Sequence, residues 1–181
     1  MSGPLFFRKE KTLPNWCEGV LKIRGPKENH EKFFKEGLEG VMYGDNHETV
    51  SVPIKEFYYE EDGNQVFCEV CGKWIWIKDT SRAFIDFNFH YEIPYLLYKG
   101  NNEADYISVL PFKQAWGVEY TEFAALAKKY ELDMRIFAVE QGIGFWCEAD
   151  ITRTGDITVK ETGSDGYHNF IWDCPYPILG G

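Results

Sequence analysis

The sequence has no long apolar run and no excess of positive charge. No stretch approaches the length needed to cross a bilayer, and residues 1–11 lack the apolar core and cleavage pattern of a signal peptide. The 19 basic residues are outnumbered by 29 acidic ones, which gives a net charge of −10. Because free-standing DNA and RNA binders neutralise phosphates with lysine and arginine, this charge argues against direct nucleic-acid binding. We also expect no membrane contact.

The cysteines are few and odd in number. The chain has five of them and no secretory signal, which favours reduced thiols in a cytosol over a disulfide framework. Aromatic residues, in contrast, are abundant, at 17% of a chain of 181 residues. That content is ample for the core of a single domain, and it predicts that some rings lie on the surface as partner contacts.

Apolar periodicity predicts strands and two helices in the outer parts of the chain. A strand is predicted over 17–24, where Val20, Lys22 and Arg24 alternate with Leu21 and Ile23. Apolar residues at helical spacing then predict an amphipathic helix from Lys27 to near Gly40; they are His30, Phe33, Phe34, Leu38 and Val41. Further along, the patterns predict a strand over 106–112, a helix over 119–130, strands over 133–140, 145–152 and 157–160, and a tight turn over 141–144.

The middle of the chain is rich in strand patterns. We expect a strand over 50–59 that Pro53 interrupts, a hairpin within 65–78, and an alternating strand over 83–91. Residues 1–13 read as an N-terminal arm. Together these patterns favour one α+β domain over 14–181, with a strand-rich insertion at about 42–105. The predicted fold is a ferredoxin-like sandwich, an antiparallel sheet with two helices on one face.

Cys68 and Cys71 form the sharpest local motif, Cys-x-x-Cys-Gly-Lys. This spacing is typical of one half of a zinc knuckle, so both residues are candidate zinc ligands. A closed site needs four ligands, and a second Cys-x-x-Cys is lacking. The alternative is a pair of thiols at a turn between apolar strands, with no cofactor bound.

Acidic residues supply the candidate contact sites for a partner. Glu60, Glu61 and Asp62 are consecutive and form either a contact surface for basic residues, a cation site or a solvated loop. Their spacing does not match a calcium loop.

Three further candidates alternate on the strand predicted over 145–152. Trp146, Glu148 and Asp150 share one of its faces, opposite Phe145 and Cys147. Because carboxylates beside a stacking ring repel phosphate, this face favours a protein partner over RNA.

The sequence shows no recognisable catalytic constellation. Cys17 follows Asn15-Trp16 without a flanking pattern that indicates a base, and His90 sits on an alternating strand. Gly142 and Gly144 lie between two predicted strands and do not open a helix, unlike a nucleotide fingerprint. We therefore expect a protein that is not an enzyme, with an enzyme of unrecognised type as the remaining alternative.

Two segments resemble a family of bacteriophage and plasmid proteins of unknown function. The first is Pro14-Asn15-Trp16-Cys17-Glu18 followed by Leu21-Lys22-Ile23-Arg24-Gly25. The second is a strand–Trp–helix–strand–Gly–strand–hairpin module; its residues are 112–116, Phe123, Leu126, Tyr130, Phe137, Glu140, Gly142, Gly144, Phe145, Gly155 and Asp156. The family's shared domain is described as ferredoxin-like, and the matching positions look like fold determinants. The arm and the middle region depart from the family pattern.

The resemblance implies an origin on a mobile genetic element and a bacterial cytoplasm as the location. Small acidic proteins of such elements often inhibit host defence enzymes, and nucleic-acid-binding nucleases present basic channels. The leading hypothesis is therefore an inhibitor of the anti-CRISPR type that binds a CRISPR nuclease or its guide-RNA complex. It requires that the excess carboxylates form a coherent exposed face. A small zinc-binding accessory module is the alternative.

Overall fold

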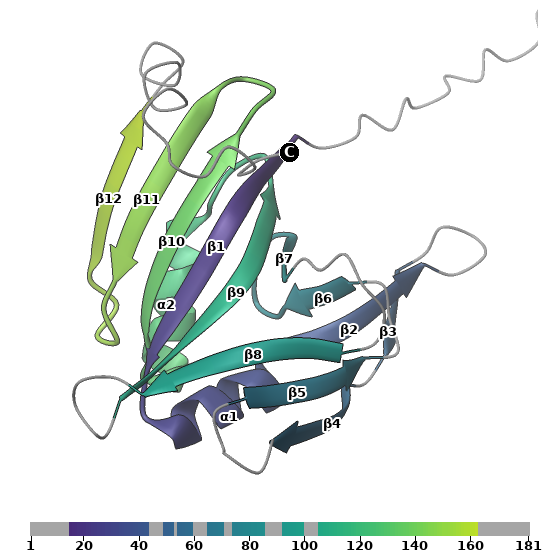
Figure 1. Ribbon diagram of the computed structural model, residues 1–181. Coiled ribbons are helices and arrows are strands. Elements are labelled where there is room, and N and C mark those ends of the chain that lie inside the picture. Colours follow the sequence, from purple (N-terminus) through teal and green to yellow (C-terminus); the bar gives the residue numbers. More distant parts are fainter. Residues whose placement is uncertain are drawn as a thin grey trace, which may run out of the picture.

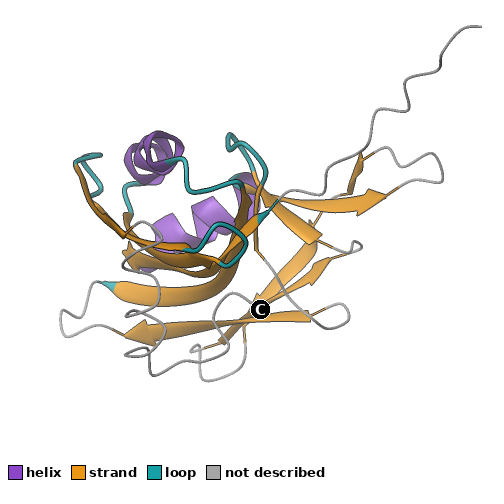
Figure 2. Ribbon diagram, turned by 90° about the horizontal axis from the view of Figure 1, so that it is seen from above, coloured by secondary structure: helices purple, strands orange, loops and turns teal. Residues whose placement is uncertain are grey.

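The computed structural model describes residues 15–43, 49–52, 54–59, 65–70, 74–85, 92–99 and 105–162. They form an antiparallel sheet with two helices on one face, as Figures 1 and 2 show. The α+β class and the two helices on one face are confirmed. Neither described helix has the length and apolar content needed to traverse a bilayer.

Five strands and one helix build the half of the sheet on which the candidate sites lie. The strand order is β12-β11-β10-β1-β9, and helix α2 follows β9 and leads into β10 on the other side of β1. The elements are β1 (Trp16–Gly25), β9 (Tyr106–Ala115), α2 (Tyr120–Tyr130), β10 (Asp133–Glu140), β11 (Phe145–Ile151) and β12 (Ile157–Thr162). All six confirm sequence predictions, although β1, β9 and β12 are longer than predicted.

The sheet divides at β9. One end of β9 pairs with β7, beyond which follow β6, β2 and β3; its other end pairs with β8, beyond which follow β5 and β4. The elements are α1 (Lys27–Glu36), β2 (Leu38–Tyr43), β3 (Thr49–Val52), β4 (Ile54–Tyr59), β5 (Gln65–Val70), β6 (Trp74–Ile77), β7 (Ala83–Ile85) and β8 (Glu92–Lys99). The strand predicted over 50–59 is described as two strands, β3 and β4, and Pro53 itself lies outside the described residues.

Alternation along the strands explains which face carries the core. On β1, Leu21 and Ile23 are fully buried toward the helices, whereas Lys22 and Arg24 are exposed on the other face. The helices contribute Phe33 and Phe123 to the same core. We call the uncovered side of β12, β11, β10, β1 and β9 the open face.

The first helix is shorter than predicted. It ends at Glu36, and the Gly37 amide donates a hydrogen bond to the Phe33 carbonyl oxygen at 2.8 Å. Leu38 and Val41 belong to β2, where they pair with Ile77 and Trp74 of β6. Their spacing from Phe34 imitates a helical repeat, but the ladder with β6 satisfies the backbone groups of this segment instead.

The hairpin predicted within 65–78 is wrong. Strand β5 pairs with β4 and β8, whereas β6 pairs with β2 and β7. Ile75 and Ile77 of β6 are fully buried in the main core, which places β6 in the main sheet and away from β5. Of the strand predicted over 83–91, β7 covers 83–85 and the rest lies outside the described residues. Strand β8 was not predicted; it contains Pro94, which lacks the amide that a ladder uses.

Candidate partner-binding site

The structure describes only part of the predicted site. Trp146, Glu148 and Asp150 lie on the open face of β11, as their alternation with buried Cys147 and Ala149 predicts. Glu60, Glu61 and Asp62 lie outside the described residues, and so does Cys71. Cys68 belongs to β5, of which only the backbone is described.

Both β11 carboxylates are paired with cations of neighbouring strands. Asp150 accepts a hydrogen bond from Arg135 of β10 at 2.5 Å, and Glu148 lies 3.8 Å from the Nζ of Lys160 on β12. The ring of Trp146 lies beside that of Phe137, with centroids 6.2 Å apart. The β11 surface is therefore not a coherent acidic face, because each carboxylate lies beside a basic residue of the neighbouring strand.

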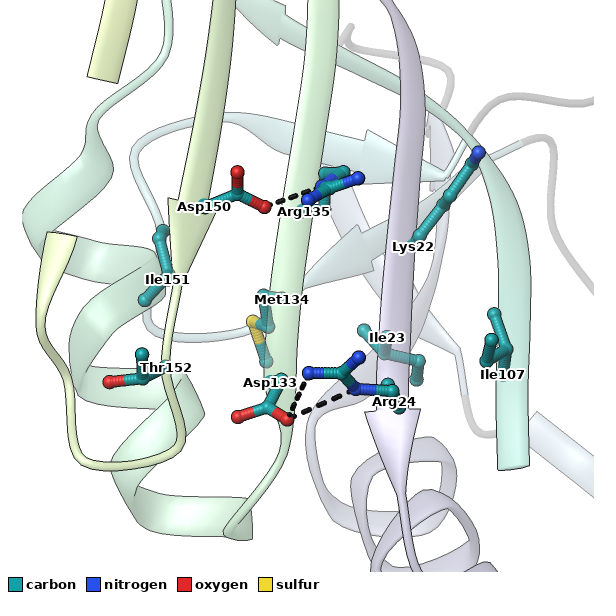
Figure 3. Close-up of a pocket in the computed structure, with 10 residues that line it drawn as sticks. All are labelled: Lys22, Ile23, Arg24, Ile107, Asp133, Met134, Arg135, Asp150, Ile151 and Thr152. Atoms are coloured by element: carbon teal, nitrogen blue, oxygen red, sulfur yellow. Dashed lines mark hydrogen bonds and ion pairs between the residues drawn. The ribbon is translucent and has the colours of Figure 1, made fainter. Parts of the chain in front are cut away.

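A shallow cleft of about 350 Å³ on the open face has the same mixed character. Arg24 pairs with Asp133 and Arg135 with Asp150, while Lys22 extends away from both carboxylates (Figure 3). Cations and carboxylates nearly balance along this cleft. It offers neither the positive field that a nucleic acid requires nor the negative field that a basic partner requires.

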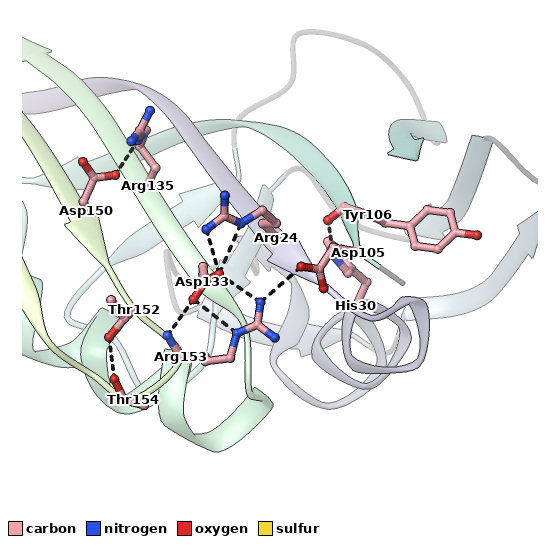
Figure 4. A network of polar contacts seen from close by, with 10 residues as sticks. All are labelled: Arg24, His30, Asp105, Tyr106, Asp133, Arg135, Asp150, Thr152, Arg153 and Thr154. Carbon is pink, nitrogen blue, oxygen red and sulfur yellow. Dashed lines mark hydrogen bonds and ion pairs between the residues drawn. The ribbon is translucent and has the colours of Figure 1, made fainter. Parts of the chain in front are cut away.

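Asp133 is the centre of the polar network at one end of this cleft (Figure 4). Its carboxylate accepts hydrogen bonds from Arg24 at 2.9 Å and from the backbone amide and the guanidinium of Arg153, both at 2.9 Å. Arg153 also lies 3.6 Å from Asp105. Burial alone would raise the pKa of Asp133, but the hydrogen bonds from both arginines outweigh it and lower the pKa to about 2. The network joins β1, β10 and the β11–β12 turn, which is a structural role.

A second groove, of about 390 Å³, lies between the loop that precedes α2 and the strands β11 and β12. We call it the end groove. Its lining residues are Ala115, Trp116, Gly117, Val118, Glu119, Phe145 and Glu161. The loop is fixed by the Trp116 amide, which donates to the Asn15 carbonyl oxygen at 2.8 Å, and by the Glu119 amide, which donates to Gln114 Oε1 at 3.1 Å.

Trp116 is held outward at the edge of the end groove. It is 55% exposed, and its φ of +73° lies in the left-handed region that a bulky residue seldom adopts. The next residue, Gly117, also has a positive φ, which a glycine tolerates. The backbone thus adopts an unfavourable conformation at Trp116 and leaves an indole ring in solvent.

The end groove is acidic. Glu119 and Glu161 are both exposed, and neither has an ion pair within the described part of the chain. The Tyr120 hydroxyl donates a hydrogen bond to Glu161 and orients that carboxylate. Burial and this bond raise the pKa of Tyr120. Two carboxylates that have no ion pair among the described residues, beside an exposed indole ring, form a favourable site for a cationic side chain.

The sequence patterns do not indicate the end groove. Trp116 matches only the strand–Trp–helix module, and Glu161 lies 42 positions after Glu119 in the chain. The available signal was a Trp-Gly pair between a predicted strand and a predicted helix. Glycine is typical of a turn, so the tryptophan before it is expected to lie in a loop and not in the buried face of either element.

Two buried cysteines lie near the end groove. Cys17 of β1 and Cys147 of β11 are free thiols and fully buried. The hydrogen bond of Cys17 to Cys147, together with burial, raises the pKa of Cys17. A catalytic thiol needs a reactive thiolate and access to substrate. The enclosure of both sulfur atoms gives no support to a role for Cys17 as a nucleophile.

His30 has a structural environment. It is fully buried, and its Nε2 lies 3.1 Å from the Tyr106 carbonyl oxygen (Figure 4). Its Nδ1 lies 2.9 Å from Ser108 Oγ. Burial lowers its pKa to about 4 despite the carbonyl oxygens of Tyr106 and Gly25. A neutral ring with Nε2–H donating to Tyr106 and Nδ1 accepting from Ser108 satisfies both partners.

Metal binding stays a prediction. Within the described ranges no group of three or more histidine, cysteine, aspartate or glutamate side chains is arranged to hold a metal ion. Since Cys71 and the side chain of Cys68 are not among the groups described, this finding does not bear on the Cys-x-x-Cys motif.

Comparisons with known proteins returned nothing similar. No model of a protein family matches the sequence, no curated protein matches it, and no solved structure matches the fold. The resemblance to phage and plasmid proteins therefore rests on the residues quoted for it alone.

Proposed function

We propose that this chain is a non-enzymatic protein of a mobile genetic element that binds and inhibits a basic host protein. The proposed target is a nuclease of an antiviral defence system, a CRISPR effector in the first place. The net charge of −10 and the resemblance to phage and plasmid proteins support the choice of target. The order of β1, β9 and β10 around α2 supports a ferredoxin-like arrangement, with the strands from β3 to β8 as additions.

The end groove is the proposed contact site, in place of the β11 face. A partner's arginine or lysine would stack on Trp116 and pair with Glu119 and Glu161. The observation that carries this choice is the contrast between the two surfaces. Glu148 and Asp150 have cations of the same molecule beside them, whereas Glu119 and Glu161 have none among the described residues. A carboxylate that is already paired contributes less to a new contact, because its own pair must be broken first.

The test is direct binding to a panel of purified defence nucleases, with DNA cleavage measured in parallel. We expect a complex whose affinity falls with added salt and which slows cleavage. The double variant E119Q/E161Q should weaken the complex at least tenfold. The matched control E148Q/D150N removes the same charge from β11 and should change affinity less than threefold.

Two outcomes count against the proposal in different ways. Absence of any complex across the panel removes the proposed target. A complex that E148Q/D150N weakens and E119Q/E161Q does not moves the contact from the end groove to the open face. The variant W116A tests the ring separately from the carboxylates. Its loss should weaken the complex although the net charge of the chain is unchanged.

A further inference from the structure

The outer edge of β12 is an unpaired sheet edge in the described structure. β12 stands at the end of the strand order, and among the described residues it pairs only with β11. The backbone amides and carbonyl groups on its other side therefore have no strand partner there. Such an edge is a template for a further strand, and proteins that keep their edges unpaired usually shield them with charge, proline or a bulge.

Two apolar side chains on this edge are exposed to solvent. Ile157 is 39% exposed and Val159 37%, and both lie on the helix side of the sheet, opposite Ile151 and Ala149 of β11. The cation of β12, Lys160, lies toward Glu148 on the opposite side of the strand. On this side of β12 the only charged residue of the strand is Glu161, two positions after Val159, and Ile157 and Val159 have no lysine of their own strand beside them.

We propose that two copies of this chain pair along β12 as antiparallel strands, with Thr158 on the two-fold axis. In this register Ile157 lies opposite Val159 of the second copy, on the helix side. Asp156, just before β12, lies opposite Lys160 of the second copy, whose ammonium would then lie between Asp156 and the Glu148 of its own chain. The two-fold axis generates a second copy of each of these pairs. One dimer contact therefore contains two apolar pairs and two pairs of opposite charge.

The neighbouring symmetric register is less favourable. With Val159 on the axis, one valine pair forms, but Ile157 then faces Glu161 and Thr158 faces Lys160. In the register at Thr158 the contact ends at Asp156, whose Oδ2 accepts hydrogen bonds from Thr152 and Thr154.

This contact does not depend on the proposed function. It uses the edge of β12, whereas the end groove lies between β11, β12 and the loop before α2. E119Q, which changes the end groove and no residue of β12, should therefore leave the pairing intact, and this separates the two proposals experimentally. A five-residue edge contact is small, so we expect a concentration-dependent dimer and not an obligate one.

Sedimentation of the full chain over a range of concentrations is the first test. The mass should rise from monomer toward dimer, and I157K/V159K should stay monomeric at the highest concentration. The control I143K introduces lysine at an apolar residue that is 67% exposed in the β10–β11 turn, and it should dimerise like the unmodified chain. Circular dichroism shows that each variant is folded. A monomer at every concentration, or dimers unchanged by I157K/V159K, overturns the proposal.

A cysteine placed on the axis tests the register. Under mild oxidation T158C should give a covalent dimer that the unmodified chain and T162C do not give, since only position 158 meets its own copy. Cross-linking at 162 and not at 158 overturns the register at Thr158. Occupation of the edge by residues 163–181 of the same chain gives a monomer in both experiments and overturns the proposal as well.

Discussion

At the scale of single residues, His30 shows how burial fixes a protonation state. The ring lies between helix α1 and strand β9, where Ser108 and the carbonyl oxygen of Tyr106 suit a neutral imidazole. A group whose pKa is about 4 in the folded chain and 6.5 in the unfolded chain binds its proton more readily after unfolding. Stability that depends on the neutral ring is therefore complete above pH 6.5 and is lost as the pH falls toward 4.

We expect the free energy of unfolding to fall by about 3 kcal/mol from pH 7.5 to pH 4 through this residue. Urea denaturation at half-unit intervals of pH measures it. The H30Q variant, which is less stable at pH 7.5, should lack this part of the pH dependence. An unchanged slope in H30Q would assign the effect to other groups.

Asp133 makes a second prediction of the same sign, at a lower pH. Its pKa is about 2 because the arginine hydrogen bonds outweigh burial, so its ionised form stabilises the fold above about pH 4 and the contribution disappears toward pH 2. D133N should lower stability at pH 7 by about 2 kcal/mol, since two arginines lose their anion. The control D150N breaks an exposed pair and should cost less than about 1 kcal/mol. A gap between the two variants that persists unchanged at pH 2 would contradict this account.

At the scale of elements, strand β1 has a position that only glycine fits. A Cβ at Gly19 would lie 2.0 Å from the Phe137 carbonyl oxygen and 2.8 Å from the Ala138 Cα, both in the backbone of β10. Backbone atoms cannot move aside as a flexible side chain can. We expect G19A to lower the free energy of unfolding by about 3 kcal/mol or more, measured by denaturant titration. V20A, on the same strand but on the open face, is the matched control and should lower the free energy of unfolding by about 1 kcal/mol. If G19A costs no more than V20A, β1 and β10 move apart easily enough to accept a Cβ at position 19.

Local patterns predicted the outer elements well and the pairings of the middle poorly. Strand β10 has the predicted bounds because its alternation begins just after Glu131, whose left-handed conformation ends α2, and stops before the turn at Gly142. The pairings of β5 and β6 were missed because they depend on partners far along the chain, such as Leu96 for Gln65 and Leu38 for Ile77. The end groove was missed for the same reason, since Trp116 and Glu161 meet only after α2, β10 and β11 are in place.

At the scale of the whole molecule, the core decides whether the middle region folds with the rest. Ile75, Ile77 and Ile85 of β6 and β7 share one buried cluster with Leu21 of β1 and Ile136 of β10. Regions that share a core lose it together, so these strands should unfold as one cooperative unit.

The variant I75A tests this cooperation, because it removes a fully buried side chain of β6 that lies far along the chain from β10. We expect it to lower the global free energy of unfolding by about 2–4 kcal/mol in a single transition. In native-state hydrogen exchange, the free energy of opening at the amides of Leu21 and Ile136 should then fall by the same amount as the global free energy of unfolding. T158A, at an exposed site on β12, is the control and should leave those amides unchanged. If I75A speeds exchange only within β6 and β7, the middle region is a separate unit that docks on an independently stable sheet, and the shared cluster does not make the fold cooperative.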